Sequence, residues 1–399
     1  MSCRLCGSPT RTLVDLGTMP PANWLQKSAE EIIPEFPLAL EYCRFADLQL
    51  RECVGAQELY SDYLYVTPNS TTLNAHYQHL IEHMLRQGYM DESTRALEIG
   101  SNRGAFLEAL RPHVTSILGV DAAANICQMA EKGGIPTICG FFSVDMAQGL
   151  IGGGRPALVI ARHCLAHNED PHVMLAGISE CIDPNGVLLI ENNYAVDMIA
   201  NNEFDQIYHE HMFYFTLHSL QRLVHRHGLR IIDAFVSAIH GGSIVCFVSP
   251  VGSKHAVQPV VVQHLAREEG FLSEKRLHAF VDEMRRIRHD LLKLLNGIRS
   301  AGKQIMNYGA TAKSATLMNF VGLTRREITA CADSTLVKQG RFLPKSGIPV
   351  ISEEQAFAES PDYFLLTAWN YKDELIRKVR DSGLQSVRFI LPIPKVTVL

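Results

Sequence analysis

Between residues 96 and 190 the chain alternates short apolar runs with amphipathic segments, and this alternation constrains the fold more than any other feature. The apolar runs cover 96–99, 116–120, 157–160 and 187–190, and the segments 105–110 and 125–132 have the spacing of helices. Apolar strands that alternate with helices predict a parallel sheet covered on both faces. We therefore expect a doubly wound α/β domain in this part of the chain.

Two further parts flank this domain. Residues 1–66 are rich in proline and cysteine and have short apolar runs without a long helix. A long amphipathic helix is predicted at 273–299, with Leu294 in its apolar stripe, and strands follow at 305–308, 328–332, 363–366 and 388–391. The predicted organisation is a cysteine-bearing module over 1–66, a first α/β domain over 67–252, and a connecting helix with a second, Rossmann-like α/β domain over 253–399.

Composition narrows the class of protein and the partners. The chain is 47% hydrophobic and 20% charged, as folded soluble proteins are. It has 37 basic and 42 acidic residues, and the basic residues form no continuous run. This balance argues against a nucleic-acid partner. The start of the chain lacks a signal-peptide pattern and no run reaches 18 apolar residues, so we expect a cytoplasmic protein without a membrane partner. Its ten cysteines are then reduced thiols or metal ligands.

A glycine-rich turn joins the first strand of the α/β domain to its first helix. Glu98 precedes the first glycine of the pattern Gly100-x3-Gly104, and Asp121 ends the next strand. The amides of such a turn can approach a ligand closely, and a strand-end carboxylate can accept both hydroxyls of a ribose. This pattern is typical of class I methyltransferases that bind S-adenosylmethionine, whereas a nicotinamide site would carry a third glycine. The cofactor contacts that we predict are Glu98, Gly100, Asn102, Gly104, Asp121, Phe141 and Arg162.

The segment 205–215 concentrates ionisable and aromatic side chains. Tyr208, His209, Glu210 and His211 are consecutive, and three more aromatic residues follow them. Histidine can accept or donate a proton near neutral pH, and a carboxylate beside it can hold its orientation. The spacing His-x-His also occurs at metal sites, but no further ligand follows at ligand spacing. The interleaved aromatic residues argue against a solvated loop, so this segment is the predicted catalytic segment.

Several separate motifs occur along the chain in one order. They are Cys3-x2-Cys6, 15–17 (Asp-Leu-Gly), 63–65, 165–167, 208–211, 240–243, 307–313, 338–341, 343–344 and 369–370. In this order the chain resembles the C-methyltransferases of bacterial deoxysugar pathways over nearly its whole length. That family methylates C3 of nucleotide-linked 3-amino- or 3-hydroxy-4-keto sugars, so the resemblance implies a small-molecule nucleotide-sugar substrate and a place in antibiotic biosynthesis.

The resemblance also implies roles for individual residues. His211 corresponds to the base of the family, with Glu210 and Tyr208 beside the sugar and His167 as a second active-site histidine. Tyr65, or as second choice Tyr63, corresponds to a tyrosine that reaches into the cleft. A hydrogen next to a carbonyl is removed only when a base is positioned and the oxyanion receives a hydrogen bond, which Tyr208 or His167 would donate. The predicted substrate contacts are His209, His240, Lys313, Lys338 and Arg341.

The turn at 308–314 again follows a strand and starts a helix. Its small residues leave amides open to a phosphate, and Lys313 adds a positive charge. From the residues alone, a tight turn with a surface lysine fits equally well. The resemblance favours a pyrophosphate site for the sugar nucleotide.

The spacing of Cys3 and Cys6 is half of a zinc site, and Cys43 is placed as a third ligand. The family closes this site with a second Cys-x2-Cys, but this chain has Ala46 at the expected position. Cys53 or Asp47 could supply the fourth ligand, and a metal-free module with reduced thiols is the alternative. We expect S-adenosylmethionine as cofactor and a structural zinc.

Other functions remain open at this point. The acceptor could be an oxygen, a nitrogen or a carbon acid that is not a sugar, the cofactor could be NAD in a nucleotide-sugar oxidoreductase, or the fold could serve binding alone. His163 is a second departure, since relatives usually carry Asn there. The nucleotide, the group at C3 and the oligomeric state stay open, and a monomer is compatible with the sequence.

Overall fold

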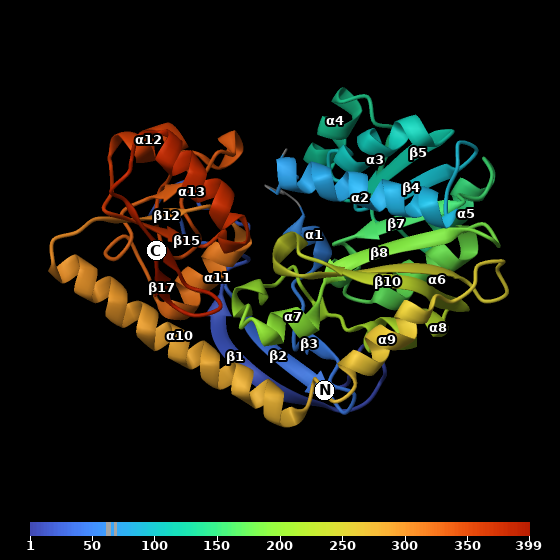
Figure 1. Ribbon diagram of the computed structural model, residues 1–399, viewed down its shortest axis with the longest axis horizontal. Coiled ribbons are helices and arrows are strands. Elements are labelled where there is room, and N and C mark those ends of the chain that lie inside the picture. The colour runs from blue at the N-terminus through green and yellow to red at the C-terminus, as the bar shows by residue number, and fades with distance from the viewer. Residues whose placement is uncertain (61–64, 68–69) are drawn as a thin grey trace.

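The computed structural model describes residues 1–60, 65–67 and 70–399 (Figure 1). The strands of these residues form three sheets, of four, seven and six strands. The predicted fold class, a small cysteine-bearing module with two α/β domains, is confirmed. Tyr63 lies outside the described residues. None of the described helices has the length and apolar character needed to cross a bilayer.

The amino-terminal sheet is antiparallel and has the order β1-β2-β3-β9. Its strands are β1 (Thr10–Met19), β2 (Phe36–Cys43), β3 (Leu48–Leu50) and β9 (Phe213–Tyr214), and the short helix α1 (Ala56–Leu59) follows them in the chain. The fourth strand therefore comes from the middle of the chain, with Leu48 opposite Tyr214 and Gln49 opposite Phe213. The sheet reaches the end of the predicted catalytic segment.

The central sheet has the order β10-β11-β8-β7-β4-β5-β6. Five strands are parallel, namely β4 (Arg95–Ile99), β5 (Ser116–Asp121), β6 (Thr137–Cys139), β7 (Leu158–Arg162) and β8 (Val187–Asn193). β10 (Leu229–Ser237) and β11 (Ser243–Pro250) form an antiparallel hairpin on β8. The strand order reverses direction between β4 and β7, which is where doubly wound sheets bind ligands.

Helices cover both faces of this sheet because its inner strands are apolar on both sides. Ala96 and Leu158 pack with α2 (Thr71–Gln87) and α3 (Ala105–Leu110), while Leu97 and Val159 pack on the other face. The other helices of this part are α4 (Ala124–Lys132), α5 (Val144–Ile151), α6 (Pro171–Cys181), α7 (Ala195–Ala200), α8 (Leu217–His225) and α9 (Pro259–Glu268). The predicted parallel α/β sheet is therefore present, with an antiparallel edge.

The carboxy-terminal sheet has the order β14-β13-β12-β15-β16-β17, and only its last pair is antiparallel. Its elements are β12 (Ile305–Tyr308), α11 (Ala312–Val321), β13 (Cys331–Ala332), β14 (Val350–Ile351), α12 (Glu353–Ala358), β15 (Tyr363–Leu366), α13 (Lys372–Asp381), β16 (Arg388–Leu391) and β17 (Thr397–Val398). The strand predicted at 328–332 is shorter, because a turn closed by the amide of Ile328 on the carbonyl of Thr324 occupies its start.

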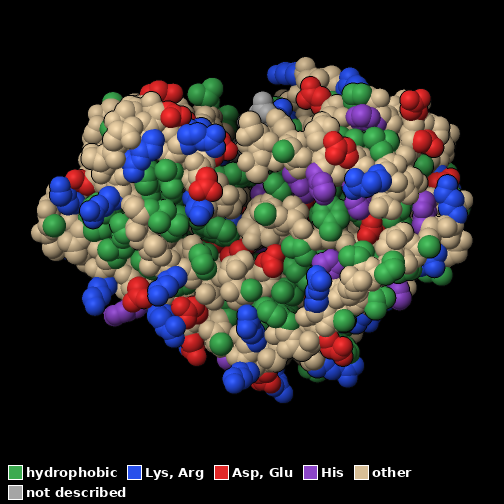
Figure 2. Space-filling view, viewed as in Figure 1, with side chains coloured by type: hydrophobic (Ala, Val, Ile, Leu, Met, Phe, Trp, Pro, Cys, Tyr) green, Lys and Arg blue, Asp and Glu red, His purple; other side chains and the backbone are tan. Residues whose placement is uncertain are grey.

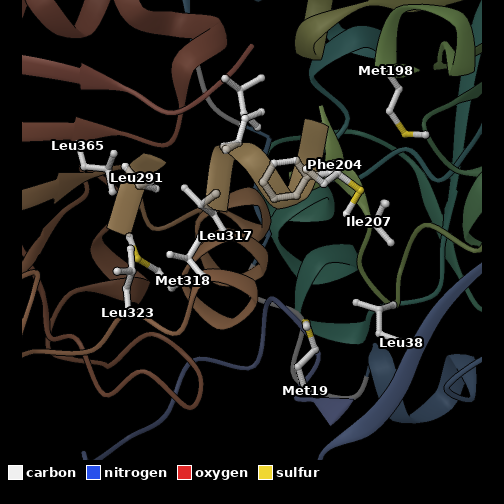
Figure 3. Packing of buried hydrophobic residues seen from close by; sticks show 14 of the residues in the cluster. Met19, Leu38, Met198, Phe204, Ile207, Leu291, Leu317, Met318, Leu323 and Leu365 are labelled. Atoms are coloured by element: carbon white, nitrogen blue, oxygen red, sulfur yellow. The ribbon is translucent and has the colours of Figure 1, made fainter. Parts of the chain in front are cut away.

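The long helix α10 (Glu274–Ser300) runs from beside the amino-terminal sheet along the carboxy-terminal domain (Figure 1). Its buried stripe contains Leu291 and Leu295, one helical turn apart, and the predicted Leu294 is only partly buried. One apolar cluster joins this helix to β1, to α11 and to the residues before the catalytic segment, and Figure 3 shows part of it. This cluster holds the carboxy-terminal domain beside the amino-terminal module.

Candidate active site

A cavity of about 730 Å³ lies where the three parts of the chain meet. Figure 2 shows a hollow between the two lobes of the molecule, with histidine side chains close to it. The cavity is lined by the predicted residues Tyr65, Glu98, Gly100, Asn102, Asp121, Phe141, Arg162, His167, Tyr208, Glu210, His211, His240, Lys313 and Lys338. Gly104, His209 and Arg341 do not line it. Most of the residues expected to bind cofactor and substrate therefore share one space.

The glycine-rich turn after β4 takes a conformation that suits glycine. Gly100 has φ +70°, and a Cβ there would lie 2.6 Å from the Cβ of Cys164. Gly104 has φ +79°, and a Cβ there would lie 2.6 Å from a methyl carbon of Ile135. Gly104 therefore allows the turn to pack against the domain rather than facing the cavity.

Two backbone amides orient the carboxylate of Asp121 at the end of β5. The amide of Asn102 donates to Oδ2 at 2.9 Å, and the amide of Ala123 donates to Oδ1 at 3.0 Å. Each carboxylate oxygen can accept a second hydrogen bond. The side chain can thus accept the hydroxyls of a ribose in a fixed orientation.

The side chain of Asn102 holds the segment 65–67 against the cavity. Its Oδ1 accepts from the amide of Thr67 at 2.9 Å, and its Nδ2 donates to the carbonyl of Tyr65 at 3.1 Å. Burial raises the pKa of Tyr65 above its usual range, so the phenol stays protonated and can donate a hydrogen bond.

Glu98 and Arg162 line the cavity beside the glycine-rich turn. Glu98 is 3% exposed, its Oε1 lies 3.7 Å from Nη1 of Arg162, and its Oε2 has no hydrogen-bond partner among the described residues. Burial raises the pKa of Glu98 to about 8, against the opposing charge of Arg162. Arg162 is held by Glu191, whose Oε2 accepts from Nε at 2.8 Å, and stacks on the ring of Tyr77 at 4.6 Å. Glu98 is therefore the less firmly paired of the two carboxylates beside Arg162.

His211 and Tyr208 form a hydrogen-bonded pair in the predicted catalytic segment. Nδ1 of His211 lies 3.1 Å from the carbonyl oxygen of Gln206, which can only accept, so this nitrogen carries the proton. Nε2 lies 2.6 Å from the hydroxyl of Tyr208 and accepts from it. Burial keeps the pKa of His211 well below its usual range, with His167 adding to the effect. The imidazole is neutral, and its basic lone pair faces Tyr208.

Two residues of the amino-terminal module, neither predicted, bind the side chains of His167 and Glu210 next to this pair. The hydroxyl of Tyr60 lies 3.0 Å from Nδ1 of His167, whose ring centroid is 5.2 Å from that of His211. Nδ2 of Asn23 donates to Oε1 of Glu210 at 2.8 Å. Burial lowers the pKa of His167 to about 4 and raises the pKa of Glu210. Neither Asn23 nor Tyr60 lies in a motif, so no signal in the sequence pointed to them.

His209 points away from the cavity although its two neighbours line it. Its ring packs edge-on against Phe36 of β2, with Nε2 3.3 Å from the carbonyl oxygen of that residue. The amide of His211 donates to the carbonyl of Tyr208 at 2.9 Å, and this tight turn brings Tyr208 and His211 to one side. The structure therefore does not place His209 among the substrate contacts.

The cavity wall opposite the glycine-rich turn belongs to the carboxy-terminal domain. Nζ of Lys313 donates to the carbonyl of His240 at 2.9 Å and lies 4.1 Å from the ring centre of Trp369. Burial lowers the pKa of Lys313. Nζ of Lys338 donates to the carbonyl of Ala310 at 2.8 Å. Arg341 is bound through its backbone amide to Lys338 and lies outside the cavity.

His163 contacts the hydrogen-bond network around Glu191. Its Nδ1 lies 3.2 Å from Oδ1 of Asn193, and its ring meets that of His240 edge-on at 4.6 Å. Burial lowers the pKa of His163 to about 4, so the ring is neutral at pH 7. Glu191 also accepts from His76 at 2.7 Å. Glu191 was not predicted, since a carboxylate inside a strand carries no motif.

The metal-ligand atoms of Cys3, Cys6, Cys43 and Asp47 all lie within 4.8 Å of one another. Three thiols and a carboxylate in such a group fit the tetrahedral coordination of zinc. Cys53, the other candidate for fourth ligand, instead contacts the guanidinium of Arg4. The chain thus carries a structural zinc site in which Asp47 stands beside the three cysteines.

Comparison with known proteins covers all three parts of the chain. The family models described as "Putative zinc binding domain", "Methyltransferase domain" and "C-methyltransferase C-terminal domain" match residues 3–60, 72–234 and 238–394. The chain is 36% identical over 404 residues to the C-methyltransferase NovU of Streptomyces niveus, a match that covers 100% of this chain and 96% of NovU.

Two solved methyltransferase structures each resemble about half of the chain. Magnesium protoporphyrin IX methyltransferase (ChlM) of Synechocystis PCC 6803 with bound SAH is 12% identical, with a TM-score of 0.36, over 48% of this chain and 91% of that chain. The N-methyltransferase NodS of Bradyrhizobium japonicum WM9 is 13% identical, with a TM-score of 0.35, over 46% of this chain and 98% of that chain.

Proposed function

Since this chain belongs to the family of S-adenosylmethionine-dependent C-methyltransferases, we propose that it methylates C3 of a nucleotide-linked 4-keto deoxysugar. One observation carries the proposal. A single cavity is bordered by the cofactor turn with Asp121, by the pair of Tyr208 and His211, and by Lys313 and Lys338 of the carboxy-terminal domain. S-adenosylmethionine, when bound, supplies an electrophilic methyl group.

His211 is the proposed base. Its Nε2 carries a basic lone pair because the ring is neutral and its proton is fixed on Nδ1 by the carbonyl of Gln206. On substrate binding, the hydroxyl of Tyr208 turns from Nε2 to the C4 oxygen, which leaves the lone pair free to take the C3 proton. Tyr208 then donates to the oxygen on which negative charge develops, and this is where a donor accelerates proton abstraction most.

Glu210 and His167 position the sugar beside this pair. Glu210 is 1% exposed and is held through Oε1 by Asn23, while its Oε2 has no hydrogen-bond partner among the described residues. A buried carboxyl oxygen aimed at the cavity suits a sugar hydroxyl or amine. His167, neutral and bound to Tyr60, provides a second polar group next to His211.

The three parts of the chain divide the work in this proposal. Residues 1–66 contribute Asn23 and Tyr65, residues 67–252 bind the cofactor and hold the base, and residues 253–399 bind the nucleotide. Lys313 and Lys338 stand on the wall opposite the cofactor turn and would neutralise a diphosphate. The carbon that accepts the methyl is thereby held between the two nucleotide-binding parts, which supplies the near-attack arrangement.

The test is a product analysis with S-adenosylmethionine that carries a carbon-13 methyl group. The enzyme is incubated with a panel of nucleotide-linked 4-keto sugars, and carbon NMR locates the new methyl group. The expected product carries it on C3. Attachment to C5, the other carbon next to the C4 carbonyl, would preserve the enolate chemistry and move the reacting position. A methyl group on oxygen or nitrogen would refute carbon methylation by this chain.

A further inference from the structure

The carbonyl oxygen of Gln206 accepts two hydrogen bonds from side chains of the predicted catalytic segment. Nδ1 of His211 donates to it at 3.1 Å, and the hydroxyl of Tyr214 donates to it at 3.2 Å. The proton of a neutral imidazole stays on the nitrogen whose hydrogen bond requires a donor. The position of this carbonyl therefore decides whether Nε2 of His211 keeps the lone pair that a base needs.

The carboxy-terminal domain contacts the residue on each side of Gln206. Nε1 of Trp369 donates to Oδ2 of Asp205 at 2.7 Å, across 164 positions of the sequence. The hydroxyl of Thr316, on α11, lies 3.4 Å from the carbonyl oxygen of Ile207, across 109 positions. The backbone that carries the Gln206 carbonyl is thus bound at both ends by the other α/β domain.

The indole of Trp369 is itself held in place on two sides. Gly241 has φ +101°, and a Cβ there would lie 2.6 Å from Cη2 of the indole. On the face of the ring, Nζ of Lys313 lies 4.1 Å from the ring centre. The segments 240–243 and 369–370, which stand out as motifs in the sequence, therefore meet at this ring and fix the direction of its N–H group.

Adhesion between the two domains does not require this hydrogen bond. Phe204 and Ile207 pack in one apolar cluster with Leu317 of α11, and Figure 3 shows the three side chains. Asp205 is 0% exposed, and its Oδ1 has no hydrogen-bond partner among the described residues. Burying a carboxylate costs free energy, and apolar residues often replace a buried polar pair without loss of stability. A hydrogen bond adds a defined direction, which apolar packing lacks and which the Gln206 carbonyl requires.

We infer that Trp369 is a positioning residue for the base, because its hydrogen bond to Asp205 holds the Gln206 carbonyl that keeps the proton of His211 on Nδ1. This inference rests on the proposed function, which gives His211 the role of base. Without the indole donor, the backbone at 205–207 shifts, and the proton distributes between Nδ1 and Nε2. A ring protonated on Nε2 has no lone pair there to accept the proton of the substrate.

NMR of the full-length protein with nitrogen-15 in its histidines reads the tautomer of His211 in the absence of substrate. A ring nitrogen that carries a proton differs in chemical shift from one that carries a lone pair, and His211→Gln identifies the signals. The wild type should show the proton on Nδ1. Trp369→Phe keeps an aromatic ring but lacks the N–H donor, so it should show both tautomers. Asp205→Ala removes the acceptor and should do the same, whereas Asp205→Asn keeps an oxygen acceptor and should resemble the wild type.

Kinetics with a nucleotide-linked 4-keto sugar give the second readout. For Trp369→Phe, kcat should fall roughly ten- to a hundredfold, the usual effect of losing a hydrogen bond to a charged group. KM should stay near that of the wild type, because the tautomer affects proton removal and not binding. Trp24→Phe is the matched control, since the other tryptophan of the chain packs on Phe36. This control should change neither the tautomer nor kcat.

The outcomes separate the possibilities. Unchanged affinity for S-adenosylhomocysteine shows that a variant is folded, and Asp205→Ala takes the place of Trp369→Phe if the latter fails this control. A folded Trp369→Phe with the proton still on Nδ1 of His211 would overturn the inference. A wild type with the proton on Nε2 would overturn it as well. A wild type that methylates none of the 4-keto sugars would overturn the proposed function, whereas the tautomers still decide the inference on Trp369.

Discussion

Oε1 of Glu98 lies 3.7 Å from the guanidinium of Arg162, too far for a direct hydrogen bond. In contrast, Oε2 of Glu191 accepts a hydrogen bond from Nε of the same arginine at 2.8 Å. The arginine is thus neutralised mainly by Glu191. Glu98 is left buried with a pKa of about 8 and is mostly protonated at pH 7.

We predict that binding of S-adenosylmethionine at pH 7 releases protons from Glu98, because a cationic ligand lowers the pKa of a nearby carboxyl. Calorimetry in two buffers of different ionisation enthalpy measures the release, and Glu98→Gln should abolish it. Affinity should rise with pH up to about 8 in the wild type and stay flat in the variant. Identical heats in both buffers would contradict this role of Glu98.

Asp121→Ala is expected to weaken binding of S-adenosylmethionine by about 1.5–3 kcal/mol, since it removes the charged acceptor for the ribose hydroxyls. Asp145→Ala serves as the matched control, because this aspartate is exposed and lies outside the cavity. Both variants are measured by calorimetry. Equal affinities would show that Asp121 serves only to hold the turn.

His211→Ala should lower the rate of methyl transfer by a factor of about 10²–10⁴, the usual effect of losing a general base. Affinity for S-adenosylmethionine should stay near that of the wild type. Exchange of the C3 hydrogen in deuterated buffer, followed by NMR without cofactor, should fall in parallel. His209→Gln is the control, because this neighbouring ring faces Phe36. A His211 variant that keeps most of its rate would move the role of base to His167.

The pKa of His167, about 4 in the folded protein, predicts a pH dependence of stability. The ordinary pKa is near 6.5, so between pH 6.5 and 4 the unfolded chain binds a proton that the folded chain does not. The free energy of unfolding should therefore fall as the pH falls through this window. Urea denaturation at pH 7 and pH 5 measures the fall, and His167→Gln should reduce it. The same dependence in both proteins would show that His167 does not contribute.

Metal analysis should find one zinc per chain, and the fourth ligand can be tested directly. Cys3→Ser and Asp47→Ala should lose zinc to a chelator at lower concentration than the wild type, whereas Cys53→Ser should keep it, because Cys53 contacts Arg4. With cobalt in place of zinc, the visible spectrum of Asp47→Ala should differ from that of the wild type. A cobalt spectrum unchanged by Asp47→Ala would exclude the carboxylate as ligand.

Local patterns predicted those parts of the fold and site that depend on nearby residues. The strands around the Gly100 turn, the end of β5 at Asp121 and the extent of α10 follow from short-range spacing. Orientation within a turn could not be predicted in this way. The hydrogen bond between the amide of His211 and the carbonyl of Tyr208 closes a tight turn, and in this turn the ring of His209 points away from the cavity.

Residues that reach the site from a distant part of the chain were also missed. Asn23 contacts Glu210, which lies 187 positions later in the sequence, and Tyr60 contacts His167, which lies 107 positions later. Such contacts depend on how the amino-terminal module docks, which no local pattern encodes. Asp47 was open as a metal ligand for a different reason, since its carboxylate reaches the cysteines through the folded β2–β3 turn inside the module.

The pairing of β3 with β9 means that the module of residues 1–66 cannot be exchanged as an independent cassette. A chimera that took this module from a relative would place a foreign β3 against Phe213 and Tyr214, two and three residues after the proposed base. Recombination between members of the family should therefore preserve function only where both strands come from one parent. For the same reason, we expect substitutions in these two strands to be inherited together as related enzymes diverge.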